Sequence, residues 1–281
     1  MEKIDRLGWA AGISFKAYGV KVGLRVSEPD ALDRLLDHLP YGWEPAATPT
    51  VERLYSLVVG GVGRRSNVRR FNLLYGNLDR LARTRNLDEA LEVFQSNLQL
   101  YLAEEARRRV FVHAGVVGWH GRAIVIPGRS FSGKTTLVAE LVRAGATYYS
   151  DEYAVFDSRG RAHPYPKPLS LREDGSDRQK NYTVDEIGGR PGVKPLPVGL
   201  LIVSEYKRGA RWRPQQVSAG QGGLALLANT VSARRQPETV LTTLKSVLSQ
   251  AVVLKGARGE AVDMANSILK HLDDRLTASS Q

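Results

Sequence analysis

A ten-residue stretch near the middle of the sequence, GRSFSGKTTL, has the composition and spacing of a phosphate-binding loop. Glycines let the backbone approach a phosphate closely, and the N–H groups at the start of the following helix attract an anion. Lys134 would neutralise the β- and γ-phosphates of ATP or a related triphosphate, and the Thr135 hydroxyl would bind Mg²⁺. The nucleotide-binding residues expected from this pattern are Gly128, Arg129, Ser130, Phe131, Ser132, Gly133, Lys134, Thr135 and Thr136.

The surroundings of this stretch favour a phosphate site over a chance glycine turn. The apolar run AIVI precedes it as a strand would, and TTLVAELVRAG follows as a helix that turns Leu137, Leu141 and Val142 inward. A lysine at the start of a helix is unfavourable against the helix dipole unless an anion binds there. The position of Lys134 therefore predicts a bound triphosphate.

Two further groups of polar residues lie near this stretch in the sequence. Asp151 and Glu152 follow the short strand ATYYS, seventeen residues after Lys134. A three-turn helix and a returning strand bring that point back to the phosphate edge of the sheet, so we expect Asp151 near the Mg²⁺ and the γ-phosphate. The alternative is an acidic pair in a surface turn. His113, in the run VFVHAGVV, is either a packed histidine or a member of the same site.

This part of the sequence resembles the catalytic domain of bacterial HPr kinase/phosphorylase and its shorter relatives, notably lasso peptide kinases. The resemblance rests on two runs in this order, VHAGVV and VIPGRSFSGKTTLVAELVRAGATYYSDEYAVFD. Three features carry the resemblance. A strand with His113, Ala114 and Gly115 stands fifteen residues before the first loop glycine, the phosphate loop follows, and the acidic pair comes on the very next strand. The likeness covers about residues 110–172.

The resemblance implies a role for each matching residue. Asp151 corresponds to the acid that activates the substrate hydroxyl, and His113 and Lys134 complete the catalytic set. The second acid of the family's pair is normally an aspartate close to the metal, and here it is Glu152. Thr135, Asp151 and Glu152 are accordingly the implied metal ligands.

The implied activity is a Mg²⁺-dependent transfer of the γ-phosphate of ATP to a serine hydroxyl of a peptide or small protein, such as the C-terminal serine of a lasso peptide precursor. The family's further glutamate lies in an E-x-R-G segment, which has no clean copy here; Glu173 and Asp174 are the nearest candidates. A nucleotide-binding regulatory module without transfer activity, a small-metabolite kinase and a nucleic-acid-linked NTPase remain alternatives. HPr kinases assemble as hexamers, so the resemblance raises a homo-oligomer as one state, while the sequence leaves it open.

The composition of the chain excludes several kinds of site and several classes of protein. The chain has 281 residues, no cysteine and a net charge of +11, so it lacks disulfides, thiolate metal sites and a cysteine nucleophile, and its charge attracts polyanions. No run approaches the ~20 apolar residues of a membrane helix, and no signal-peptide pattern opens the chain, so a cytoplasmic protein without a membrane partner is expected. The basic run RRSNVRR, residues 64–70, lacks interleaved aromatic residues, so nucleic acid is not the expected partner.

The elements predicted around these residues give an α/β fold with a small N-terminal α+β lobe, residues 1–108. The resemblance implies that residues 109–281 form a P-loop-containing, HPr kinase-like catalytic domain. Residues 172–197 are rich in glycine, proline and charge and are expected to form a mobile loop. Asn86 and Glu89 predict a capping box at the start of the clearest helix. Helices are predicted at 30–39, 87–108, 133–145, 236–250 and 261–272, and strands at 13–26 as a hairpin, 51–61, 69–76, 110–117, 122–127, 147–157, 197–206 and 251–256.

Overall fold

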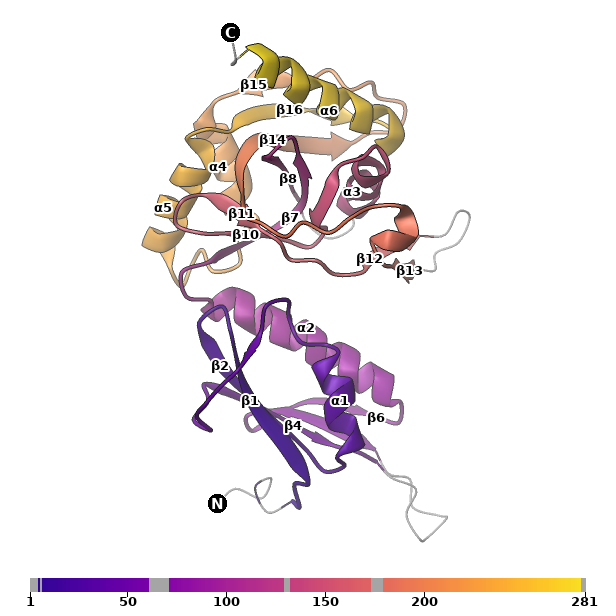
Figure 1. Ribbon diagram of the computed structural model, residues 1–281, viewed down its shortest axis with the longest axis vertical. Helices are drawn as coiled ribbons and strands as arrows, with labels where there is room; N and C mark the ends of the chain where they lie inside the picture. The colour runs from indigo at the N-terminus through magenta and orange to yellow at the C-terminus, as the bar shows by residue number, and fades with distance from the viewer. Residues whose placement is uncertain (1–4, 6, 61–70, 129–131, 173–178, 279–281) are drawn as a thin grey trace. The chain divides into compact units, whose positions relative to one another are not determined.

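The computed structural model is a mixed α/β protein (Figure 1). It describes residues 5, 7–60, 71–128, 132–172 and 179–278. The chain divides into two compact units, Met1–Arg108 and Arg109–Gln281, each with its own hydrophobic core. Within the described part, no helix is both long and apolar enough to cross a membrane.

The N-terminal unit contains a six-stranded sheet with the order β3-β1-β2-β4-β5-β6. Its elements are β1 (Ala11–Ala17), β2 (Val20–Val26), α1 (Asp30–Leu36), β3 (Glu44–Pro45), β4 (Arg53–Val58), β5 (Asn72–Gly76), β6 (Asp79–Thr84) and α2 (Leu87–Glu105). The predicted hairpin is confirmed, because β1 and β2 pair antiparallel with Ala17 opposite Val20. The turn residues Tyr18 and Gly19 both have positive φ, 51° and 87°, as a two-residue hairpin turn requires.

Both helices of this unit pack against apolar side chains of the sheet, including Phe15 of β1 and Leu57 of β4. The predicted cap of α2 is partly wrong. The Asn86 side chain accepts a hydrogen bond from the Asp88 N–H, but Glu89 receives one from the Thr84 hydroxyl instead of closing a capping box. The helix ends three residues earlier than expected, at Glu105.

The C-terminal unit is built on an eight-stranded sheet with the order β11-β10-β7-β8-β14-β16-β15, in which β9 also pairs with β7. Its strands are β7 (Val110–Trp119), β8 (Arg122–Pro127), β9 (Thr147–Ser150), β10 (Tyr153–Phe156), β11 (Arg161–His163), β14 (Leu196–Tyr206), β15 (Gln215–Val217) and β16 (Val252–Arg258). The strands β8, β14 and β16 are parallel, so their carboxyl ends share one edge. The start of β14 pairs with β11, so the sheet curls back on itself.

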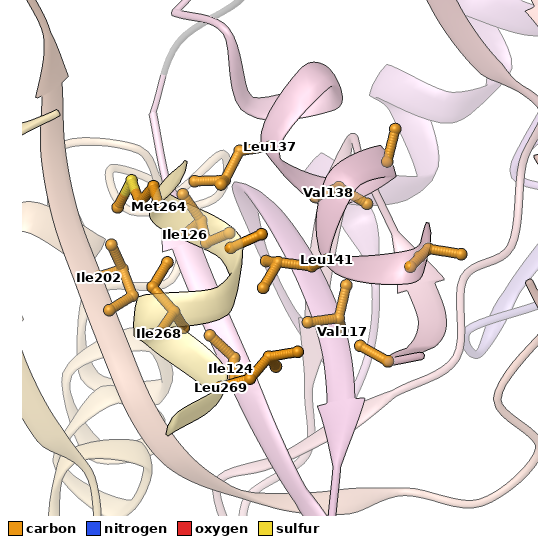
Figure 2. Packing of buried hydrophobic residues seen from close by; sticks show 14 of the residues in the cluster. Val117, Ile124, Ile126, Leu137, Val138, Leu141, Ile202, Met264, Ile268 and Leu269 are labelled. Atoms are coloured by element: carbon orange, nitrogen blue, oxygen red, sulfur yellow. The ribbon is translucent and has the colours of Figure 1, made fainter. Parts of the chain in front are cut away.

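Helices cover both faces of this sheet. On one face α3 (Lys134–Arg143) and α6 (Ala261–Ala278) pack on β8 and β14, and on the other α4 (Ala219–Leu227) and α5 (Pro237–Leu248) do so. Figure 2 shows the first of these interfaces, in which the contacting side chains are Leu137, Val138, Leu141, Met264, Ile268, Leu269, Ile124, Ile126 and Ile202. Alternate residues of β14 serve the two cores, as the two-residue period of a strand requires.

Apart from shifted helix ends, two predicted segments differ from the structure. The expected single strand over 147–157 is broken at the acidic pair into β9 and β10, because the Ser150 hydroxyl accepts the N–H groups of Glu152 and Tyr153 and turns the chain. The stretch 172–197, expected to be a loop, contains secondary structure in its described part. It holds β13 (Gln179–Tyr182), which pairs with β12 (Leu169–Arg172), and a 3₁₀ helix, η2 (Asp185–Ile187).

Candidate functional site

The candidate phosphate loop, residues 128–136, begins directly after β8 and includes the first three residues of α3. Gly128 follows the last residue of β8, and its N–H donates to the His113 carbonyl at 3.1 Å. Gly133 precedes α3 in the left-handed region, with φ of 78°, a conformation that favours glycine. The predicted residues Arg129, Ser130 and Phe131 lie outside the described residues, whereas the other members of the predicted set border the start of α3.

Lys134 is the first residue of α3 and is largely withdrawn from solvent, with 8% of its surface exposed. Burial lowers the pKa of its ammonium group, and the charges of Asp151 and Glu152 act in the opposite direction. A lysine in this place adds its positive charge to the positive end of the helix dipole. Both charges would therefore attract an anion to the start of α3.

Asp151 lies against the same helix start. The Thr135 hydroxyl lies close enough to its carboxylate to lower the pKa of Asp151, and the Tyr148 hydroxyl donates to its Oδ1 at 3.0 Å. Burial raises the pKa of Asp151, and the two hydroxyl hydrogen bonds partly oppose that rise by favouring the carboxylate. A carboxylate with a raised pKa is a better proton acceptor near neutral pH than an ordinary surface aspartate.

Strand β7 joins the two halves of the site because it pairs with both β8 and β9. The N–H of Ala114 donates to the Glu152 carbonyl at 3.1 Å, while the neighbouring His113 carbonyl accepts from Gly128. Consecutive residues of one strand therefore hold the start of the candidate phosphate loop on one side and the acidic pair on the other. Gly115 completes the arrangement, since a Cβ there would come within 2.5 Å of Val138 Cγ2 on α3.

His113 is half-buried beside the aromatic ring of Tyr153, with ring centroids 4.6 Å apart. Burial lowers the pKa of His113; the charge of Glu152 raises it and that of Lys134 lowers it. The imidazole is thus neutral at neutral pH, and it lies close enough to Glu152 and Lys134 for both charges to influence its pKa. His113 belongs to the same group of side chains as the acidic pair.

Glu152 is turned toward a residue that the sequence analysis did not select. Its Oε2 lies 2.5 Å from Nζ of Lys167, and the backbone carbonyl of Lys167 lies 2.8 Å from the Tyr148 hydroxyl. Tyr148 and Lys167 therefore fix the orientation of the two predicted acids. The sequence offered a weak signal for Tyr148 only, namely an aromatic residue three positions before Asp151 on the same short strand.

Arg258, at the end of β16, is the third residue that the sequence analysis missed. Its Nη2 donates to the Ser132 carbonyl at 2.7 Å, and only 4% of the residue is exposed. It comes from a strand more than a hundred residues further along the chain. The guanidinium holds the backbone just before Lys134 and adds a second positive charge beside the candidate phosphate loop.

Two of the three predicted metal ligands, Thr135 and Asp151, lie close together and could help to hold a magnesium ion bound to a nucleotide. Within the described residues, no group of three or more His, Cys, Asp or Glu side chains is arranged to hold a metal ion on its own. Mg²⁺ is usually held by one or two carboxylates together with substrate phosphates. The neighbouring side chains of Thr135 and Asp151 offer such oxygens, whereas the Glu152 carboxylate pairs with the Lys167 ammonium group. Glu173 and Asp174, the candidates for a third acid, lie outside the described residues.

No protein-family model matches this chain, and no curated protein sequence matches it.

Proposed function

We propose that residues 109–281 form an HPr kinase-like P-loop catalytic domain, and that the chain is a cytoplasmic, Mg²⁺-dependent kinase that transfers the γ-phosphate of ATP to a serine hydroxyl. The observation that supports this most is the proximity of the Thr135 hydroxyl to the Asp151 carboxylate, whose pKa that hydroxyl lowers. It ties a buried carboxylate with a raised pKa to the residue that follows the lysine of the candidate phosphate loop.

Different residues of the candidate site would bind the phosphates and the magnesium ion. The N–H groups at the start of α3 and the ammonium group of Lys134 would hold the β- and γ-phosphates. Thr135 and Asp151 would hold Mg²⁺, which supplies charge neutralisation for the phosphates when it is bound. His113 is neutral beside Lys134 and Glu152, so it can donate a hydrogen bond without adding charge.

The transfer step itself needs one proton acceptor. The serine oxygen attacks the γ-phosphorus as its proton passes to the Asp151 carboxylate. The bond between the γ-phosphorus and the bridging oxygen breaks, and ADP leaves with the electron pair. Phosphoryl transfer demands little covalent chemistry from a protein, so positioning and charge account for most of the rate.

The acceptor that we propose is a peptide or small protein, with the C-terminal serine of a lasso peptide precursor as the specific candidate. The net charge of +11 supports an acidic or already phosphorylated substrate, because a basic surface speeds the encounter with an anionic partner. The Lys167 ammonium group pairs with the carboxylate of Glu152, the residue next to Asp151.

Labelled ATP and a library of serine-ending peptides test the proposal. Wild-type protein should produce phosphoserine, detected by mass spectrometry, only when Mg²⁺ is present. Lys134→Ala should weaken MgATP binding in calorimetry and abolish the product. MgATP binding without any phosphorylated peptide would favour a nucleotide-binding regulatory module, and phosphorylation of small metabolites alone would favour a metabolite kinase.

A further inference from the structure

The sheet of the N-terminal unit has two edges that differ in length and composition. One edge is β3, which has two residues, one of them a proline. A short edge strand with a proline is a common way to prevent a further strand from adding to a sheet. The other edge is β6, which has six residues and no proline. Among the described strands β6 pairs only with β5, so it presents a row of N–H and C=O groups with which another chain can pair.

A shift of register brings two arginines of β6 to the same face of the sheet. Arg80 lies opposite Tyr75 of β5 and Arg83 lies opposite Leu73, because the register shifts between Leu74 and Tyr75. In a regular strand, residues three positions apart would face opposite sides. Leu74 belongs to the core that α2 covers. Its two neighbours on β5, and the arginines opposite them, therefore lie on the other face of the sheet.

The basic charge continues beyond the end of β6. Arg85 follows the strand directly, and its guanidinium carbon lies 5.6 Å from the centroid of the Phe71 ring, over which the Arg83 guanidinium lies at 4.0 Å. The three arginines are exposed, and within the described residues none of them takes part in an ion pair. We call residues 79–85 the β6 edge.

These charges select the kind of strand that can add to the β6 edge. Like charges opposite each other on neighbouring strands destabilise a sheet, whereas opposite charges stabilise it. Two copies of the β6 edge would therefore repel each other. An extended segment with carboxylates at alternate positions would meet Arg80 and Arg83 on one face of the sheet, while its backbone pairs with that of β6.

The aromatic residues beside the arginines favour a peptide over a nucleic acid. Single-stranded nucleic acids bind to aromatic side chains on which their bases stack. The Arg83 guanidinium covers the Phe71 ring, and Tyr75 is partly buried on β5. The unpaired N–H and C=O groups of an edge strand, in contrast, match the backbone of an extended peptide.

We propose that the β6 edge is a docking site for an acidic peptide segment, which binds in an extended conformation as an additional strand. Main-chain hydrogen bonds with β6 hold the segment, and its carboxylates pair with Arg80, Arg83 and Arg85. This binding activity goes beyond the proposed function, because it belongs to the N-terminal unit and does not require that residues 109–281 transfer phosphate.

Fluorescence anisotropy of three labelled eight-residue peptides tests the docking site on the full-length protein. The peptides are an alternating Glu–Thr sequence, the same sequence with alternate backbone nitrogens methylated, and an alternating Lys–Thr sequence. The Glu–Thr peptide should bind most tightly, because it alone has both the carboxylates and the N–H groups that the site requires. Arg80→Ala and Arg83→Ala should each weaken its binding about 1.5- to 5-fold, the factor for one cross-strand ion pair. The double variant Arg80→Glu, Arg83→Glu should weaken it about tenfold or more, because attraction becomes repulsion.

The double variant Arg211→Glu, Arg213→Glu is the matched control, because both residues are exposed in the C-terminal unit and the net charge changes equally. At about 0.15 M salt, which screens distant charges, it should bind the Glu–Thr peptide as the wild type does. Equal losses in the two double variants would overturn the docking site, as would equal binding of the methylated or the Lys–Thr peptide, or failure of the Glu–Thr peptide to bind.

A single-stranded oligothymidylate, added as a competitor, tests the alternative partner. Displacement of the Glu–Thr peptide by a lower concentration of oligothymidylate than of unlabelled peptide would assign the β6 edge to nucleic acid and overturn the proposal. Thermal unfolding midpoints equal to that of the wild type show that the variants are folded. If charge reversal unfolds the protein, the variant Arg80→Gln, Arg83→Gln removes the charges without repulsion and should also weaken binding of the Glu–Thr peptide; unchanged affinity would refute the role of the arginines.

Discussion

Replacement of Gly133 by alanine tests whether the Arg258 guanidinium packs against the residue that precedes α3. Gly133 has φ of 78°, and an added Cβ would collide with the Arg258 guanidinium. A non-glycine residue in the left-handed region costs about 1–2 kcal/mol. A displaced guanidinium would also lose its 2.7 Å hydrogen bond to the Ser132 carbonyl, which contributes about 1.5–3 kcal/mol for a charged donor. The free energy of unfolding should therefore fall by about 2.5–5 kcal/mol in Gly133→Ala.

Gly188 supplies a matched control because its φ is 77° and nothing lies within 4 Å of a Cβ added there. Gly188→Ala should lose only the backbone contribution, about 1–2 kcal/mol. Urea unfolding of both variants gives the two free energies, and a cycle with Arg258→Ala isolates the contact. The cycle should be strongly non-additive, because Gly133→Ala costs less once the guanidinium is gone. Equal losses at the two glycines, or additive effects of Gly133→Ala and Arg258→Ala, would refute the reasoning.

Two further variants probe titrating groups. Tyr148→Phe removes a hydrogen bond that lowers the pKa of Asp151, so the pKa of Asp151 should rise. The acid limb of the kcat–pH profile should then move to higher pH. An acid limb at the wild-type position would show that Tyr148 does not influence the base. Burial raises the pKa of Asp157, but hydrogen bonds from His163 and Arg161 outweigh it and lower the pKa from 3.8 to about 2. This stabilisation is complete above pH 3.8 and is lost as the pH falls toward 2. Above pH 3.8 the free energy of unfolding, measured with urea, should therefore be about 1–3 kcal/mol higher for the wild type than for Asp157→Asn, and this difference should disappear as the pH falls toward 2. A difference independent of pH would contradict this account of Asp157.

The local parts of the site could be read from the sequence. The start of α3 at Lys134 and its end before Gly145 follow from glycine placement and apolar spacing, both of which act over a few residues. The proximity of Asp151 to Thr135 follows from one helix and one returning strand, whose lengths the sequence gives directly. Asp151 lies in the turn between β9 and β10, and both of these strands pair with β7, which carries His113.

Other parts depend on contacts that no local pattern encodes. Arg258 reaches Ser132 only because β16 pairs with β14, a register that is set by packing across the sheet. Helix α4 was missed because three glycines at positions 220, 222 and 223 lower the helix propensity of its sequence. Its signal was nevertheless present, since Ser218 and Gln221 form a capping box at its start. The break at Ser150 was missed because a serine that turns a strand and one that continues it look alike in sequence.

Transfer and binding, measured together on Asp151→Asn, test the central claim most directly. MgATP affinity is measured by calorimetry, and phosphorylation of a serine-ending peptide is measured with γ-labelled ATP on the same preparation. If Asp151 accepts the serine proton, the variant should bind MgATP within about tenfold of the wild type and lose about 10²–10⁴-fold in kcat, the usual contribution of a general base. Transfer at the wild-type rate in Asp151→Asn would contradict the account.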